Sequence, residues 1–313
     1  GPGFHKVIMI QQLAEIAAIA DNKAEPTFDN TIVGIERSGR MLDRVNSAFF
    51  GLVQANTNPA LDKVQTVVAP KLAAHSDAIY LNPKLFARVK SLYDRRAGLK
   101  LDAEALQVLT IYYRQFVHAG ANLGPKERTR LQEINKQNAG LETQFQQKLV
   151  AGAKAGALVV DNKADLAGLT EAEIASAEEA AKARGMKGKY VLPLQNTTQQ
   201  PLLTSLSNRA VREKLFNQSW TRTEKKDAND TRAIIAQRAI SRAEKAKLLG
   251  YPNYAAYVLY DQMAQTPQAV EKFISQLVAP TRAKAAEEAR LIQAAIDKEG
   301  KRFDLKPWDW QRY

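Results

Sequence analysis

The sequence predicts an all-α fold, with helical bundle-like lobes and a small inserted antiparallel β-ribbon. Alanine, the best helix former, supplies much of the 45% hydrophobic content. Capping residues mark the starts of several helices, and apolar residues recur at spacings of three and four. Only two short apolar stretches depart from the helical pattern. The 313 residues suffice for one large helical domain or two smaller ones.

The helix ends are marked by local sequence. Three starts combine an N-cap residue with proline at the first helical position: Asn58-Pro59, Asn82-Pro83 and Thr266-Pro267. Thr170 and Glu173 form a capping box before an alanine-rich run that Gly185 closes. Gly250 closes another helix, and Pro252 prevents that helix from continuing. We therefore expect helices on both sides of the middle of the chain.

Two apolar stripes predict which helix faces are buried. The first consists of Leu131, Ile134, Leu141, Phe145 and Leu149, and the second of Leu42, Val45, Phe49 and Leu52. Each stripe lies along one face of a helix of 3.6 residues per turn. Each needs a partner helix, which is typical of a bundle.

Residues 157–160 and 190–194 read as two short strands, and we expect them to pair as the antiparallel ribbon. The polar residues 195–200 that follow read as a loop. We place a boundary there, between an N-terminal helical lobe with the ribbon (1–195) and a second helical segment (196–313).

Composition excludes several classes of protein. There is no cysteine, which excludes disulfides, thiolate metal sites and cysteine catalysis. No apolar run approaches the roughly 20 residues that cross a bilayer, so we expect no membrane span. The net charge is +12, but the basic residues are mixed with acidic ones, and we expect no nucleic-acid binding. Gly1-Pro2-Gly3 resembles the remnant of a cleaved tag, which we expect to leave His5 mobile.

The search for catalytic residues finds none. A zinc hydrolase needs two histidines one helical turn apart and a third ligand, whereas this chain has only His5, His75 and His118. We expect each to be a surface or packed side chain, and we expect no catalytic, cofactor-binding or metal-binding residue. The acidic pairs Asp227 with Asp230 and Glu287 with Glu288 look like solvated faces. The aromatic residues Trp308, Trp310 and Tyr313 either form a ligand wall or, as we favour, pack the C-terminal segment.

Four segments resemble a known family. They are residues 245–257 (KAKLLGYPNYAAY), residues 190–201 (YVLPLQNTTQQP), Pro307-Trp308-Asp309 and Phe28-Asp29-Asn30-Thr31. The sequence from about residue 11 onward is similar to the non-catalytic N-terminal part of the thimet-oligopeptidase-like zinc metallopeptidases. The second segment is most similar to the bacterial peptidyl-dipeptidase, or dipeptidyl carboxypeptidase, branch. The chain departs from the family between Val7 and Gln11, where the family has a longer helical segment.

The resemblance implies a two-lobed helical enzyme whose channel admits small or unfolded peptides and which releases dipeptides from peptide C-termini. In the family, zinc is held by the two histidines of a His-Glu-x-x-His helix and a downstream glutamate. This chain contains no such motif, so we expect it to be inactive alone, as a piece of a longer enzyme or as a naturally shortened relative. The resemblance implies either bacterial cytoplasm or periplasm.

Two other interpretations remain open at this stage. A non-catalytic helical binding or interaction protein could use the same scaffold, and a basic helical protein could bind nucleic acid. For the peptidase interpretation, the partners are peptides in the full-length enzyme. We also expect either self-association or binding of a C-terminal catalytic fragment.

Overall fold

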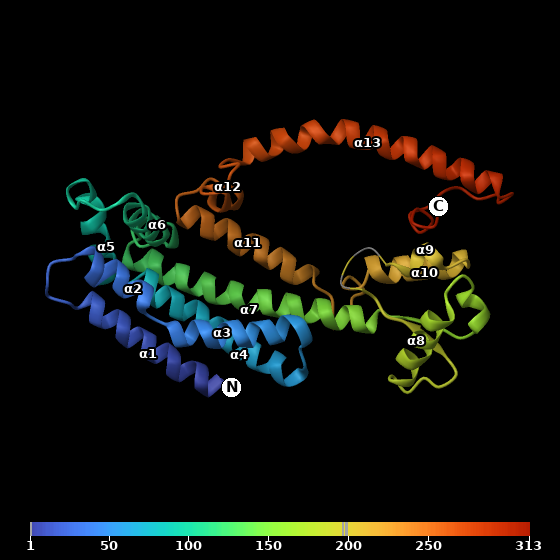
Figure 1. The fold of residues 1–313 in the computed structure, drawn as a ribbon, viewed down its shortest axis with the longest axis horizontal. Helices are drawn as coiled ribbons and strands as arrows, with labels where there is room; N and C mark the ends of the chain where they lie inside the picture. Colours follow the sequence, from blue (N-terminus) through green and yellow to red (C-terminus); the bar gives the residue numbers. More distant parts are fainter. Residues whose placement is uncertain (1, 196, 198–199) are drawn as a thin grey trace. The chain divides into compact units, whose positions relative to one another are not determined.

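The structure, a computed structural model, describes residues 2–195, 197 and 200–313. It confirms the all-α fold with one small antiparallel ribbon (Figure 1). The chain forms two compact units: unit 1 contains residues 1–144 and 237–257, and unit 2 contains residues 145–236 and 258–313. The boundary at residues 195 and 196 stays a prediction. Asn196, Thr198 and Gln199 of the predicted loop lie outside the described residues.

Unit 1 is built from helices packed through their apolar faces. Its elements are α1 (Pro2–Ala20), the π-helix η1 (Phe28–Val33), α2 (Gly34–Arg37), α3 (Arg40–Asn56), α4 (Pro59–Tyr80), α5 (Pro83–Asp94), the 3₁₀ helix η2 (Arg96–Gly98) and α6 (Ala103–Ala119). Three further helices, α7 (Pro125–Ala155), α11 (Arg232–Leu248) and α12 (Tyr254–Leu259), contribute residues to both units.

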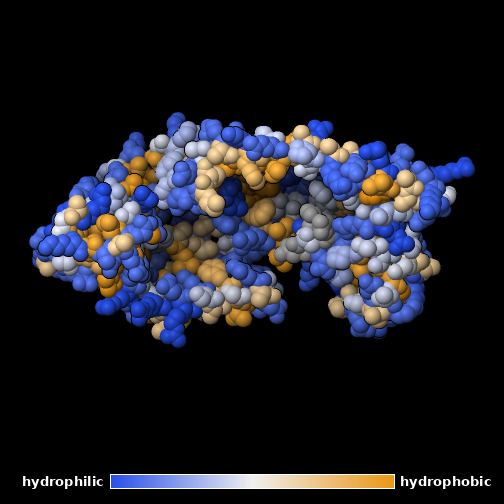
Figure 2. Space-filling model, turned by 45° about the horizontal axis from the view of Figure 1, so that its top comes forward, coloured by the Kyte–Doolittle hydropathy of each residue, from blue (hydrophilic) through white to orange (hydrophobic). Residues whose placement is uncertain are grey.

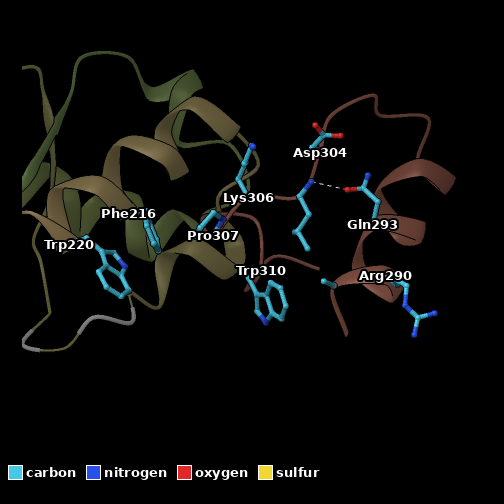
Figure 3. A pocket seen from close by; sticks show the side chains of 10 residues that line it. Phe216, Trp220, Arg290, Gln293, Asp304, Lys306, Pro307 and Trp310 are labelled. Atoms are coloured by element: carbon cyan, nitrogen blue, oxygen red, sulfur yellow. Dashed lines mark hydrogen bonds between the residues drawn. The ribbon is translucent and has the colours of Figure 1, made fainter. Parts of the chain in front are cut away.

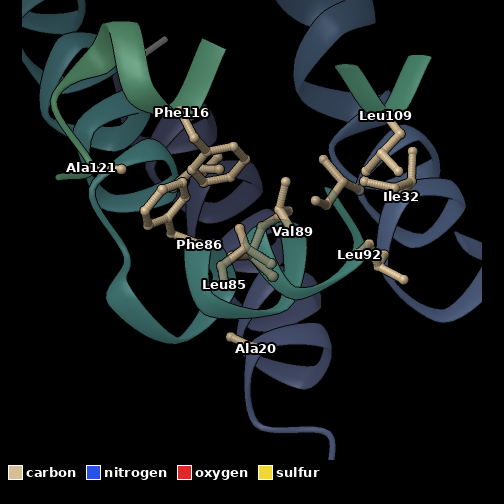
Figure 4. Packing of buried hydrophobic residues seen from close by; sticks show 12 residues of the cluster. Ala20, Ile32, Leu85, Phe86, Val89, Leu92, Leu109, Phe116 and Ala121 are labelled. Carbon is tan, nitrogen blue, oxygen red and sulfur yellow. The ribbon is translucent and has the colours of Figure 1, made fainter. Parts of the chain in front are cut away.

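The core of unit 1 lies where α1, α5 and α6 meet. Figure 4 shows Phe86 and Phe116 packed among aliphatic side chains, with their rings stacked 5.9 Å apart. Leu85, Val89 and Leu109 are completely buried beside them. Burying such side chains contributes about 1.5–3 kcal/mol each, which makes this cluster the main source of stability in the unit.

Unit 2 contains the ribbon, in which β1 (Leu158–Val160) pairs antiparallel with β2 (Tyr190–Leu192) and Val159 lies opposite Val191. Its other elements are the 3₁₀ helix η3 (Lys163–Leu166), α8 (Glu171–Lys182), α9 (Leu202–Ser205), α10 (Arg209–Trp220) and α13 (Pro267–Lys298). Helix α8 packs on β2. The core of this unit includes Leu192 of β2, Leu203 of α9 and Leu215 of α10, all of which are buried. The ribbon therefore carries part of a hydrophobic core.

The predicted helix caps are present. The Asn58 and Asn82 side chains each accept two backbone N–H groups of the following helix. Thr170 and Glu173 form the predicted capping box, and Thr266 caps α13. Gly185 and Gly250 follow their helices with φ of 74° and 82°, a backbone region that favours glycine. Local sequence therefore fixes these ends.

The expectation that His5 is mobile was wrong. His5 lies within α1 and is only 2% exposed, with its ring 5.3 Å from that of Phe49 on α3. Residues 2–20 form the single helix α1, which packs on α3 and α4, so His5 lies inside a packed helix. The second predicted stripe is also shorter than expected, because Leu42 is buried but Leu52 is 58% exposed.

The described residues contain no helix that is both long enough and apolar enough to cross a membrane.

A series of hydrogen-bonded polar side chains connects three helices of unit 1. Asp77 of α4 accepts a hydrogen bond from Asn135 Nδ2 of α7 at 2.8 Å, and Asn135 Oδ1 accepts one from Lys245 Nζ of α11 at 2.8 Å. Asp77 is 8% exposed. Burial raises the pKa of Asp77 to about 6, although the Asn135 hydrogen bond and the Lys245 charge oppose this increase. The ionised form of Asp77 therefore destabilises the folded chain.

We predict that Asp77→Asn flattens the pH dependence of folding stability. The pKa of Asp77 is raised in the folded chain, so its contribution lowers the free energy of unfolding as pH rises from 4 through 6. A difference of about two pKa units corresponds to at most about 3 kcal/mol. Urea unfolding from pH 4 to 7 should show the variant gaining stability relative to the wild type. Asp94→Asn, at an exposed carboxylate, is the control, and parallel curves for Asp77→Asn and wild type would contradict the prediction.

Candidate functional site

The Pro307-Trp308-Asp309 element is held in unit 2 by a buried ion pair. Asp309 is completely buried, and Arg209 and Arg212 lie one turn apart on α10. Arg212 Nη2 donates to Asp309 Oδ1 at 2.8 Å, and Arg209 Nη2 donates to Asp309 Oδ2 at 2.9 Å. The backbone N–H of Lys306 donates to the same oxygen at 3.1 Å. Each carboxylate oxygen therefore has at least one charged donor.

Electrostatics keep Asp309 ionised. Burial alone raises the pKa of Asp309, but hydrogen bonds from Arg209 and Arg212 outweigh burial and hold that pKa below its usual range. Arg212, itself 2% exposed, also donates to the carbonyl oxygens of Leu206 and Ser207 at 2.9 and 3.1 Å. The ion pair thus fastens the C-terminal segment to the turn before α10.

The end of α13 is joined to the same segment. Gln293 Nε2 donates to the Phe303 carbonyl oxygen at 3.0 Å. Gln293 Oε1 accepts from the Leu305 N–H at 2.8 Å (Figure 3). The Arg209 guanidinium carbon lies 4.2 Å from the centre of the Phe303 ring. One side chain of α13 therefore fixes residues 303–305 through both of its amide atoms.

These contacts shape a groove of about 650 Å³, which we call the aromatic groove. Its lining residues include Phe216 and Trp220 of α10, Gln293 of α13, and Pro307 and Trp310 (Figure 3). Trp220 is 58% exposed and Trp310 is 38% exposed. Exposed tryptophan in a groove commonly marks a surface that binds another chain or an apolar ligand.

The predicted aromatic cluster divides between two roles. Trp310 lines the aromatic groove, as the ligand-wall interpretation requires. Trp308 instead packs, with its ring 6.2 Å from that of Phe216, and the Tyr313 hydroxyl accepts from Lys301 Nζ at 3.0 Å. Trp308 therefore packs as we favoured, Trp310 lines the groove, and the Tyr313 hydroxyl is held by a hydrogen bond.

The three histidines lie on different helices of unit 1. His5 is on α1, His75 on α4 and His118 on α6, where His118 stacks on the Tyr257 ring at 4.0 Å. Within the described part of the chain, no three His, Cys, Asp or Glu side chains lie close enough together to hold a metal ion. The zinc that the family resemblance implies does not fit these residues.

The structure gives partners for three residues of the acidic pairs, namely Asp227, Asp230 and Glu287. Asp230 accepts from the backbone and side chain of Arg232 at the start of α11, and Asp227 accepts from the Asn229 N–H at 2.8 Å. Glu287 pairs with Lys284 on the exposed surface of α13. These contacts resemble ordinary caps and surface ion pairs.

Comparison with known proteins supports the family resemblance. Residues 202–313, which include the ion pair and the aromatic groove, match the model of peptidase family M3. The sequence resemblance is confirmed. The chain is 47% identical over 305 residues to the dipeptidyl carboxypeptidase of Escherichia coli and 45% identical over 303 residues to that of Salmonella typhimurium. Both alignments cover 97% of this chain.

The chain is also similar to the oligopeptidase A of Haemophilus influenzae, with 26% identity over 294 residues, which are 90% of this chain and 42% of the relative. The chain spans about 45% of the length of the two dipeptidyl carboxypeptidases. More than half of each curated relative therefore has no counterpart in the 313 residues.

Sequence reasoning missed Arg209 and Arg212. The Pro307-Trp308-Asp309 element pointed to Asp309, and a carboxylate in a buried segment requires a partner that bonds to it. The sequence did not show which residues those partners are. Because the two arginines lie 100 and 97 residues earlier in the chain, no local pattern connects them to Asp309.

We predict that Asp309→Ala destabilises unit 2 by about 3–5 kcal/mol, since the variant leaves the buried Arg212 guanidinium without its carboxylate. Urea unfolding should give the change, and hydrogen exchange should show lost protection in residues 303–313. Asp304→Ala is the control because its exposed side chain lies in the same segment. Equal stability of the two variants would contradict the anchoring role.

We also predict that the dialysed chain carries no stoichiometric zinc, because its histidines lie on separate helices and it has no cysteine. Elemental analysis should find well under one zinc per chain. A His75→Gln, His118→Gln double variant should give the same value as the wild type, and one tightly held zinc that these substitutions remove would overturn the prediction.

Proposed function

We propose that this chain is the non-catalytic N-terminal portion of a zinc metallopeptidase that releases dipeptides from the C-termini of peptides. The observation that carries the proposal is the 47% identity to a dipeptidyl carboxypeptidase over 97% of the chain. Identity at this level over 305 residues supports a common fold and a common role in the larger protein. In that role the chain forms one wall of the substrate channel.

The chain alone should be inactive. The sequence has no His-Glu-x-x-His motif, and its described residues offer no metal cluster. We therefore assign the zinc and the catalytic glutamate to the part of the relatives that this chain does not match. The residues of this chain would shape and position that part.

Exposed apolar side chains of α13 support association with another polypeptide. Phe273 and Leu277 lie one turn apart, and so do Ile274 and Val278, and all four are at least 47% exposed. Figure 2 shows apolar patches of this kind among the hydrophilic side chains that cover most of the visible surface. A long helix with a wide apolar face is marginal in water unless another surface covers that face.

We predict that peptidase activity requires the missing part. The chain alone should not cleave an N-terminally blocked peptide, whereas mixing it with the unmatched portion of the Escherichia coli relative should release C-terminal dipeptides. A chelator should abolish this cleavage, and zinc should restore it. Zinc-dependent cleavage by the pure chain alone would overturn the proposal.

Analytical ultracentrifugation tests the association itself. Phe273→Ser with Leu277→Ser should weaken binding of the catalytic portion by about tenfold or more, about 1.4 kcal/mol. Glu287→Ser with Glu288→Ser, on the same helix, should leave binding within about twofold. Self-association of the chain without binding of the catalytic portion would favour a helical interaction protein on the same scaffold.

A further inference from the structure

The aromatic groove of unit 2 is formed by elements that are bonded to one another. Phe216 and Trp220 lie one turn apart on α10, with their ring centres 5.5 Å apart. Trp310 comes from the C-terminal segment, which the Asp309 ion pair and the Gln293 side chain hold in place (Figure 3). The groove therefore exists without help from another molecule.

Most of the groove lining is apolar. Besides the aromatic rings, it includes Ala289 of α13 and Leu305 and Pro307 of the C-terminal segment. Gln293 also lines the groove, but both of its amide atoms already bond to backbone groups of residues 303 and 305. The volume of about 650 Å³ lies in the range of sites that enclose an organic ligand, which is room for a few bulky side chains.

An apolar stripe continues from the groove along α13. Its members follow one another at intervals of one or two turns and fall within an arc of roughly 60° at 100° per residue: Ile274, Val278, Ala285 and Ala289. Every residue from 271 to 288 is exposed, so nothing in the described chain covers this part of the helix. The stripe from Ile274 to Ala289 is about 22 Å long, or about four helical turns. The groove therefore lies at one end of a longer apolar surface.

The relatives indicate what covers this surface. More than half of the length of both dipeptidyl carboxypeptidases has no counterpart in the 313 residues. The groove and α13 lie within residues 202–313, the part of the chain that matches the model of peptidase family M3. Tryptophan is enriched among the residues that carry the binding energy of interfaces, and two exposed tryptophans line this groove. The groove is therefore suited to bind a polypeptide of the longer protein.

We propose that the aromatic groove receives bulky apolar side chains of an amphipathic helix of the catalytic portion, and that this helix lies along the α13 stripe. Amphipathic helices commonly bind apolar grooves through anchors spaced one turn apart. Arg290 and Lys306 line the groove, and Asp304 is the one acidic residue among its described lining, so acidic residues beside the apolar face of the helix complement it. This inference rests on the proposed function and adds the surface and the kind of segment that it binds.

The tryptophans of the chain report on the groove directly. The sequence contains three: Trp220 and Trp310 line the groove, whereas Trp308 packs against Phe216. A chain labelled with fluorinated tryptophan should give three fluorine NMR signals, which Trp220→Phe, Trp308→Phe and Trp310→Phe assign. Addition of the unlabelled catalytic portion of the Escherichia coli relative should shift the Trp220 and Trp310 signals saturably and the Trp308 signal less.

Two alanine substitutions on α13 locate the binding. Ala289→Glu places a charge in the groove lining and should weaken binding of the catalytic portion by about tenfold or more. Ala283→Glu is the matched control, because Ala283 is exposed, lies about 120° around the helix from Ala289 and does not line the groove. It should leave the affinity within about twofold. Arg290→Gln with Lys306→Gln should reduce the dependence of the affinity on salt. Circular dichroism establishes that each variant is folded.

The outcomes separate this inference from the proposed function. Restored peptide cleavage with unmoved Trp220 and Trp310 signals, or with equal affinities of the two alanine variants, would overturn the groove assignment and leave the proposed function intact. Saturable shifts of both signals without restored cleavage would support the groove assignment and contradict the proposed function. Shifts that follow the concentration of this chain alone would place a second copy in the groove and overturn the inference.

Discussion

A buried polar group destabilises a folded chain unless another group bonds to it, and this constraint organises both units. In unit 2 it joins Asp309 to Arg209 and Arg212, which brings residues 303–313 back onto α10. In unit 1 it joins Asp77, Asn135 and Lys245 across three helices. Apolar packing stabilises each unit, but packing alone permits helices to rotate or slide. These directional bonds select one arrangement.

The sequence predicted what depends on neighbouring residues. Asn58, Asn82 and Thr170 cap the helices that follow them because an N-cap bonds to N–H groups two or three positions away. The β-branched residues around Val159 and Val191 predicted the ribbon for a similar reason. The four segments that resemble a known family then connected the helices to a class of enzyme, which capping and strand patterns alone do not identify.

The sequence did not predict what depends on distant residues. The Asp309 ion pair joins positions about 100 residues apart, and a cavity in unit 1 is lined by side chains from Gln12 to Tyr112. His5 shows the converse error. Its position beside residues that resemble a tag remnant suggested mobility, yet Ile8 and Met9 on the same helix are buried and pack with Leu42 of α3. These few apolar contacts hold the first turns of α1 in place although they lie near the start of the sequence.

The two polar sites differ in a way that bears on function. Around Asp309, donors and acceptors match: two guanidinium groups and a backbone N–H face one carboxylate, so the site is complete as a structural anchor. Around His75 the match is incomplete, because Nε2 lies 2.7 Å from Gln12 Oε1 whereas Nδ1 is buried without a hydrogen-bond partner in the described protein. The Asp309 site therefore fixes its segment with its charges satisfied, whereas the His75 site leaves a buried acceptor whose desolvation costs stability.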